Sequence, residues 1–131
     1  MAGYPIPWCA DSDAGVFLFN QREYWSAHEA WENVWAVSEP NPKLFYQGLI
    51  QIAAGFVKLQ RRQHKGGMAN LRKGLEKFRT LDDAVGDLVV PILYKDLFNQ
   101  SRGVRVSLFD QGEARLVARA WDLWPRIAYR E

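Results

Sequence analysis

Residues 24–35 read YWSAHEAWENVW, and the spacing of the large side chains in this stretch decides the fold class. At about 100° per residue, four residues fall on one stripe of a helix: Tyr24, His28, Trp31 and Trp35. Glu32 lies one turn after His28, at the edge of that stripe. The stretch therefore predicts a helix with an aromatic face and a histidine–glutamate pair at its border.

Helix start and stop signals bound this stretch on both sides. Asn20 and Glu23 resemble a capping box, which predicts that the helix begins at Gln21. The segment 38–42 contains two prolines, so the helix is expected to end near Val37.

Apolar residues at helical spacing continue beyond these prolines. Residues 43–63 are expected to form a second helix, and the glycine-containing segment 64–67 a turn. A third helix should follow, because Met68, Leu71, Leu75 and Phe78 mark an apolar helix face.

The last fifty residues carry weaker signals. Pro91 is expected to divide segment 81–99 into two helices, or to start the second one. Residues 100–110 are expected to form a loop or a short extended segment, and residues 112–129 a final helix.

Alternating strand patterns are nearly absent, so the expected fold class is all-α, a single-domain helical bundle of four to six helices. We expect an extended N-terminal arm over residues 1–19, motif-bearing core helices over 20–80 and C-terminal helices over 81–131. The second and third helices should pack as an antiparallel hairpin.

Composition limits the function classes. The chain has 131 residues, 48% hydrophobic and 14% aromatic, which excludes disorder and collagen. The single cysteine excludes an internal disulfide and a cysteine zinc site. There is neither a candidate membrane span nor a secretory signal pattern, so we expect a cytoplasmic protein without a membrane partner.

Charge is concentrated in one segment. Residues 58–79 carry eight lysines and arginines against one glutamate, although the net charge of the whole chain is only +2. Such a run is typical of a solvated helix face. The functional alternative is a surface that binds nucleic acid or another polyanion.

His28 and Glu32 also allow two interpretations. Imidazole and carboxylate at i, i+4 converge, and together they can supply part of a divalent metal site. Glu29 or Glu32 would then be the general base, with His28 beside it. The structural alternative is a histidine at the core edge that is braced by Glu32.

The second expected helix carries its own polar stripe. Gly48, Gln51 and Gly55 share one face, and Gln47 and Lys58 flank it. Glycine in a helix costs about 1 kcal/mol relative to alanine, so close packing of a partner helix should offset the cost. Gln51 either satisfies buried groups or orients a substrate.

We expect the tryptophan-rich helix to be that partner. The two helices should pack antiparallel, with the ridge of Trp31 and Trp35 on Gly48 and Gly55. His28 and the neighbouring carboxylates would then share one polar site with Gln51 on the second helix.

The paired motifs resemble a known family. The pattern His-Glu-x-Trp-Glu-x-x-Trp, followed by Tyr-Gln-Gly-Leu-Ile-Gln-Ile-Ala, is similar to domain of unknown function family 309 over about residues 17–80. The resemblance implies a small α-helical bundle, and members have carried the label of predicted metal-dependent hydrolase. Position by position, it marks His28, Glu29, Glu32 and Trp35, then Gln47, Gly48 and Gln51. It also implies a histidine near Lys58 in many relatives, and lysine is a poor metal ligand.

Three functional hypotheses remain. The first is a module that binds an unknown small molecule or protein between the two helices through Gln47, Gln51, Trp31, Trp35 and Lys58. The second is a hydrolase with catalytic His28, Glu29 and Glu32 and one divalent metal ion on His28 and Glu32. The third is polyanion or nucleic-acid binding through residues 58–79.

Overall fold

The computed structural model describes residues 3–111 and 124–131, with the side chains of residues 108–111 left aside. Over these residues the chain forms five helices and two very short strands, which confirms the all-α fold class. The helices are α1 (Ala10–Asn20), α2 (Tyr24–Ala36), α3 (Pro40–Gln60), α4 (His64–Val85) and α5 (Tyr94–Gln111). The strands β1 (Tyr4–Pro5) and β2 (Leu88–Val89) pair in parallel, Tyr4 with Leu88.

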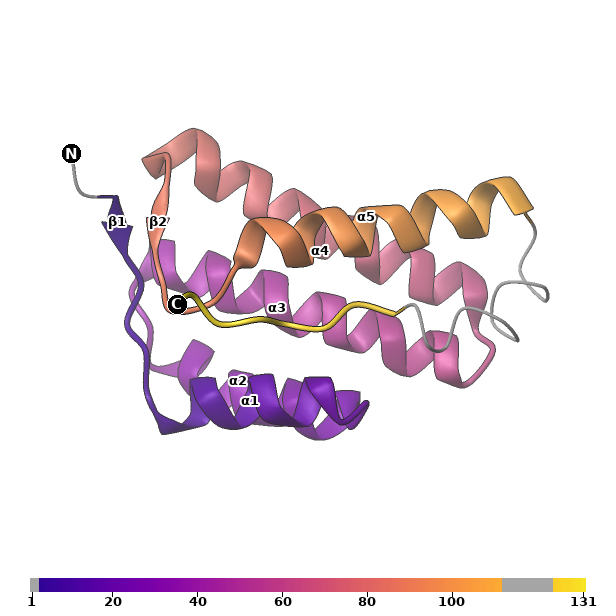
Figure 1. The fold of residues 1–131 in the computed structure, drawn as a ribbon, viewed down its shortest axis with the longest axis horizontal. Coiled ribbons are helices and arrows are strands. Elements are labelled where there is room, and N and C mark those ends of the chain that lie inside the picture. Colours follow the sequence, from indigo (N-terminus) through magenta and orange to yellow (C-terminus); the bar gives the residue numbers. More distant parts are fainter. Residues whose placement is uncertain (1–2, 112–123) are drawn as a thin grey trace.

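Helix α3 lies in the middle of the molecule. Figure 1 shows α1 and α2 together on one side of it and α4 with α5 on the other. Its fully buried residues include Phe45, Leu49, Ile52 and Phe56, which pack in one continuous core. Among the described residues, no helix has the length and apolarity needed to cross a membrane.

The α3–α4 hairpin is antiparallel, as predicted, and glycines allow its close approach. A Cβ atom at Gly74 would lie 2.9 Å from the Gly48 carbonyl oxygen, and one at Gly67 would lie 3.0 Å from the Gly55 carbonyl oxygen. Gly48 also faces the ring of Phe78. The helix that offsets these glycines is therefore α4, and the prediction that they receive the tryptophan ridge of α2 is wrong.

Trp31, the fully buried tryptophan of that ridge, packs against α1 instead. Trp31 is fully buried, and a Cβ atom at Gly15 would lie only 2.1 Å from its Nε1 atom. The same indole nitrogen donates a hydrogen bond to the Ser12 carbonyl oxygen at 3.2 Å. The missing side chain of Gly15 thus makes room for Trp31.

The N-terminal region differs from its prediction. The extended arm expected over residues 1–19 is wrong from residue 10 on, because Ala10–Asn20 is helical. Asn20 does not cap α2, which begins at Tyr24 with Glu23 as its N-cap. Asn20 instead donates to the Ile127 carbonyl oxygen at 2.9 Å and accepts from the Ile127 N–H at 2.8 Å.

Two short turns explain the other shifted boundaries. Arg22 and Arg62 have positive φ angles, 63° and 59°, and each reverses the chain within three residues. The turn predicted at residues 64–67 is therefore wrong, because those residues are already helical. Pro40 and Pro42 begin α3, where the first turn needs no N–H donors.

The C-terminal predictions also change. Helix α4 continues to Val85, and Pro91 lies between β2 and α5 rather than inside a helical pair. Residues 100–110 belong to α5, so the predicted loop is wrong. The final helix expected over residues 112–129 lies mostly outside the described residues; the described part, residues 124–129, is not helical.

Candidate functional site

The outer edge of α2 brings together the predicted pair His28 and Glu32 and a third side chain, Trp25. The imidazole of His28 stacks on the indole of Trp25, with ring centroids 5.0 Å apart and an interplanar angle of 13°. On its other side, His28 Nδ1 lies 3.0 Å from Glu32 Oε1. The predicted His28–Glu32 pair is thus present. The two side chains are close enough for an ion pair, but the angle at the contact does not meet the geometry of a hydrogen bond.

Exposure weakens the reading of this pair as an internal brace. The His28 side chain is 17% exposed, whereas that of Glu32 is 50% exposed. A half-exposed carboxylate keeps much of its hydration, so the loss of its partner costs little. The brace therefore contributes less stability than a desolvated pair would.

Helix α2 lies antiparallel beside α3, as predicted. Lys43 Nζ lies 4.8 Å from the centre of the Trp35 ring at one end of the hairpin. At the other end, Gln60 Nε2 donates to the Arg22 carbonyl oxygen at 3.2 Å. Counting from these contacts places Gln51 at about the level of His28.

A partly exposed stripe of α3 carries the predicted amides. Residues of this stripe recur at i, i+3, i+4 and i+7 and are half-buried: Leu44, Gln47, Gln51, Ala54 and Lys58. The face with Gly48 and Gly55 packs on α4, and Lys43 contacts α2, so the stripe lies between those two packing faces. Lys58 Nζ donates to Asn70 Oδ1 of α4 at 2.9 Å.

Three polar atoms of this region are buried without a hydrogen-bond partner among the described residues: His28 Nδ1, Trp35 Nε1 and Gln51 Oε1. Leaving such an atom unpaired costs about 1–3 kcal/mol. Side chains on a helix lean toward its N-terminus, so Trp35 and Gln51 lean toward one another along the antiparallel pair. A shared site for His28 and Gln51 stays a prediction, because no recorded contact joins them.

Two other predicted site residues, Trp31 and Glu29, do not lie with the polar atoms of this region. Trp31 is fully buried beside α1, so it packs in the core and does not line a surface site. Glu29 is exposed on α2. Trp25 and Lys43 were not predicted, although the sequence held a signal for Trp25, which precedes His28 by three residues.

The described residues do not fit a metal ion. They contain no group of three histidine, cysteine, aspartate or glutamate side chains that could surround one. His28 and Glu32 supply two ligands, whereas a catalytic zinc site uses three protein ligands and an open position. Lys58 is bonded to Asn70 and offers no third ligand.

Some cationic side chains of the basic segment, residues 58–79, contact neighbouring side chains of the protein. Arg72 pairs with Glu76 at 2.8 Å, and Arg79 lies 5.4 Å from the centre of the Phe98 ring. Lys65 and Lys73 are exposed on α4. The segment thus forms a solvated helix face, and its affinity for polyanions stays a prediction.

Comparison with known families gives one match. The model of the domain of unknown function DUF309 covers residues 13–70, from the second turn of α1 into α4. Residues 13–70 match the DUF309 family. The predicted resemblance is confirmed over this range, which contains every candidate residue of α2 and α3. No curated protein and no solved structure matches the chain significantly.

The DUF309 match also separates two parts of the molecule. The α2 edge and the half-buried stripe of α3 lie inside it, whereas most of α4 and all of α5 lie outside. The family description assigns no activity, so function has to be argued from the site itself.

Proposed function

We propose that this protein binds an extended peptide segment of a partner protein along the α2 edge and the α3 stripe, both within the segment that matches DUF309. The observation that carries the proposal is the pair of buried polar atoms Trp35 Nε1 and Gln51 Oε1, which have no hydrogen-bond partner among the described residues, beside His28 Nδ1, which contacts only Glu32. An indole N–H requires an acceptor and an amide oxygen requires a donor. A peptide main chain offers both in each residue.

The geometry of the region supports an extended ligand. His28 and Trp35 are two helical turns apart, about 10 Å along α2. An extended chain of three residues spans that length. The indole of Trp25 is 53% exposed and offers an apolar surface at one end of this line.

The hydrolase hypothesis is less well supported than peptide binding. Its metal would have two ligands from the described residues, and the proposal therefore includes no metal-dependent step. Polyanion binding by residues 58–79 is the remaining alternative, and it predicts strong salt dependence. Peptide binding through uncharged hydrogen bonds predicts an affinity that changes very little with salt concentration.

Nuclear magnetic resonance of the tryptophan indole N–H groups tests the proposal. The probe is acetyl-trialanine dimethylamide, a neutral peptide with main-chain donors and acceptors. We expect its addition to shift the Trp35 indole resonance in a saturable manner. Acetyl-triproline dimethylamide has the same carbonyl groups but lacks N–H donors, so it should bind several-fold more weakly.

Two variants make the test specific. Gln51→Leu should abolish the difference between the two probes, because it removes the acceptor for the peptide N–H. Gln63→Ala alters an exposed glutamine outside the stripe and should leave both affinities unchanged. No shift of the Trp35 resonance at saturating probe, or equal affinities for the two probes in the unaltered protein, would contradict the proposal.

A further inference from the structure

A second site lies on the opposite side of α3, between α4 and α5. A cavity of about 270 Å³ opens there. Residues from two turns of each helix line it: Phe78, Arg79 and Asp82 of α4, and Tyr94, Lys95, Phe98 and Asn99 of α5. All of them lie outside the segment that matches DUF309.

The walls of this cavity are aromatic. Phe78 is anchored by Phe45 of α3, with ring centroids 5.6 Å apart at 79°, and Tyr94 contacts the same Phe45 ring at 6.3 Å. The guanidinium of Arg79 lies over the Phe98 ring. Phe78 and Tyr94 are buried and form the fixed floor of the cavity, whereas the half-buried Phe98 offers an apolar surface on which a flat ligand can stack.

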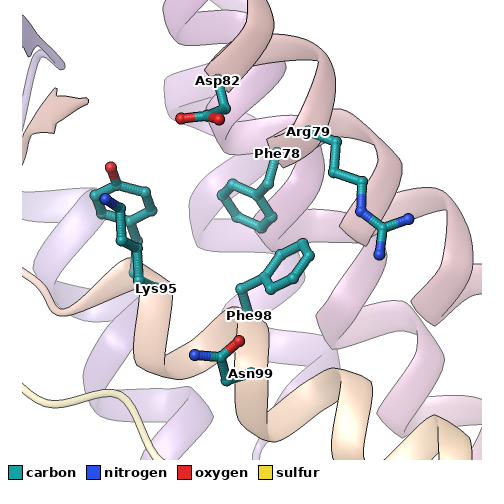
Figure 2. A pocket seen from close by; sticks show the side chains of 7 residues that line it. Phe78, Arg79, Asp82, Lys95, Phe98 and Asn99 are labelled. Atoms are coloured by element: carbon teal, nitrogen blue, oxygen red, sulfur yellow. The ribbon is translucent and has the colours of Figure 1, made fainter. Parts of the chain in front are cut away.

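The polar groups stand at the ends of the cavity. Figure 2 shows Phe78 and Phe98 in the middle, with Asp82 at one end and Asn99 at the other. Lys95 is held by Asp87, its Nζ atom 2.8 Å from Asp87 Oδ1. The side chains of Asp82 and Asn99 are exposed and make no hydrogen bond or ion pair with another described residue, although Asp82 interacts electrostatically with Lys95. The rim of the cavity thus offers an exposed carboxylate and an exposed amide whose hydrogen-bonding atoms have no protein partner among the described residues.

We infer that this cavity binds a small, uncharged heteroaromatic ring that carries an N–H donor. The ring would stack on Phe98 above the buried Phe78, and its amino group would donate to Asp82. Asn99 can donate to a ring nitrogen, since its side chain is both donor and acceptor. Arg79 and Lys95 balance the charges of Asp82 and Asp87, so a charged ligand gains no net attraction.

The size of the cavity agrees with this class of ligand. Its volume is just below the range of roughly 300–1,000 Å³ that is typical of small-molecule sites. One or two fused rings would fill it, whereas a nucleotide or a folded peptide would not fit. The site differs from the peptide surface on α2 and α3 in position and in ligand chemistry.

Titration with aminoquinoxaline, followed by nuclear magnetic resonance, tests this inference on the full chain. We expect saturable shifts of the Asn99 side-chain amide and of the backbone amides of its neighbours in α4 and α5. Quinoxaline has the same two rings without the amino group. It should bind about tenfold more weakly, because it cannot donate to the Asp82 carboxylate.

Three variants distinguish a built site from unspecific stacking. Asp82→Ala should make the two probes bind equally, and Phe98→Ala should weaken both. Asp83→Ala removes an exposed carboxylate that does not line the cavity and should change neither affinity. The inference would be overturned by equal binding of both probes to the unaltered protein, by an Asp83→Ala effect as large as that of Asp82→Ala, or by the absence of shifts at Asn99.

Discussion

The imidazole of His28 lies nearly parallel to the indole of Trp25, and Trp25 precedes His28 by about one turn of α2. Trp25 is itself largely exposed, whereas His28 is mostly shielded from solvent. An exposed indole on a shielded imidazole acts as a cover, and its removal should expose the histidine. The covering ring belongs to the surface that we propose as the peptide site.

Replacing Trp25 should therefore increase the reactivity of His28. We expect Trp25→Ala to speed the modification of His28 by diethyl pyrocarbonate several-fold, measured by peptide mass spectrometry. His64 serves as the internal reference. Phe17→Ala removes another exposed aromatic side chain, on α1, and should leave both rates unchanged. An unchanged His28 rate in Trp25→Ala would show that the indole does not shield it.

Gly15 should tolerate no side chain. Gly15→Ala places a methyl group against the fully buried Trp31 indole, and we expect a loss of about 1–3 kcal/mol or more in the free energy of unfolding. Urea denaturation measures it. Gly103→Ala is the matched control, because open space surrounds that position of α5 and alanine favours the helix by roughly 0.5–1 kcal/mol. Equal effects of the two substitutions would refute the packing account.

The C-terminal segment should depend on Asn20. Its side chain makes two hydrogen bonds to the Ile127 backbone, and Asn20→Ala should cost about 1–3 kcal/mol. Gln100 holds the Arg126 backbone by a similar pair of bonds that is exposed and longer, at 3.3 and 3.2 Å. Gln100→Ala should therefore cost less. Hydrogen exchange of the amide of Ile127 is the direct readout, and faster exchange in Gln100→Ala than in Asn20→Ala would contradict this ranking.

Alkaline pH should unfold the protein before Tyr24 and Tyr46 ionise in the folded state. Burial raises the pKa of Tyr24 to about 12, and that of Tyr46 likewise to about 12. In the unfolded chain both ionise near pH 10. Their stabilisation is complete below pH 10 and is lost as the pH rises from 10 toward 12, with a slope of about 1.4 kcal/mol per pH unit for each.

Tyrosinate absorbance and circular dichroism, recorded together, measure this effect. Most of the absorbance of Tyr24 and Tyr46 should appear only with the loss of helical signal. Tyr24→Phe should reduce the pH dependence of stability between pH 10 and 12. If both tyrosines ionise near pH 10 while the helices persist, burial does not control their pKa values.

Sequence periodicity was enough to predict the helical fold and the α3–α4 hairpin, because apolar faces must be buried whatever their partner. It could not identify the partner of Gly48 and Gly55, since small residues indicate close approach but not by which helix. The turns at Arg22 and Arg62 were missed because they contain no glycine or proline. They shorten the connections and move the helix boundaries.

For the candidate site, the i, i+4 spacing correctly predicted the contact between His28 and Glu32. The burial of Trp31 depends on Gly15, sixteen residues earlier, and no local pattern reveals it. The cavity between α4 and α5 joins residues on two helices that are separated by a strand, so it becomes visible only after folding.

The central claim is that α2 and α3 form one shared polar site, and proton–proton distances within it test the claim most directly. We predict nuclear Overhauser effects between the Gln51 side-chain amide protons and the ring protons of His28 or the indole N–H of Trp35. Effects from Gln51 to Asn70 of α4, without any to His28 or Trp35, would contradict the claim.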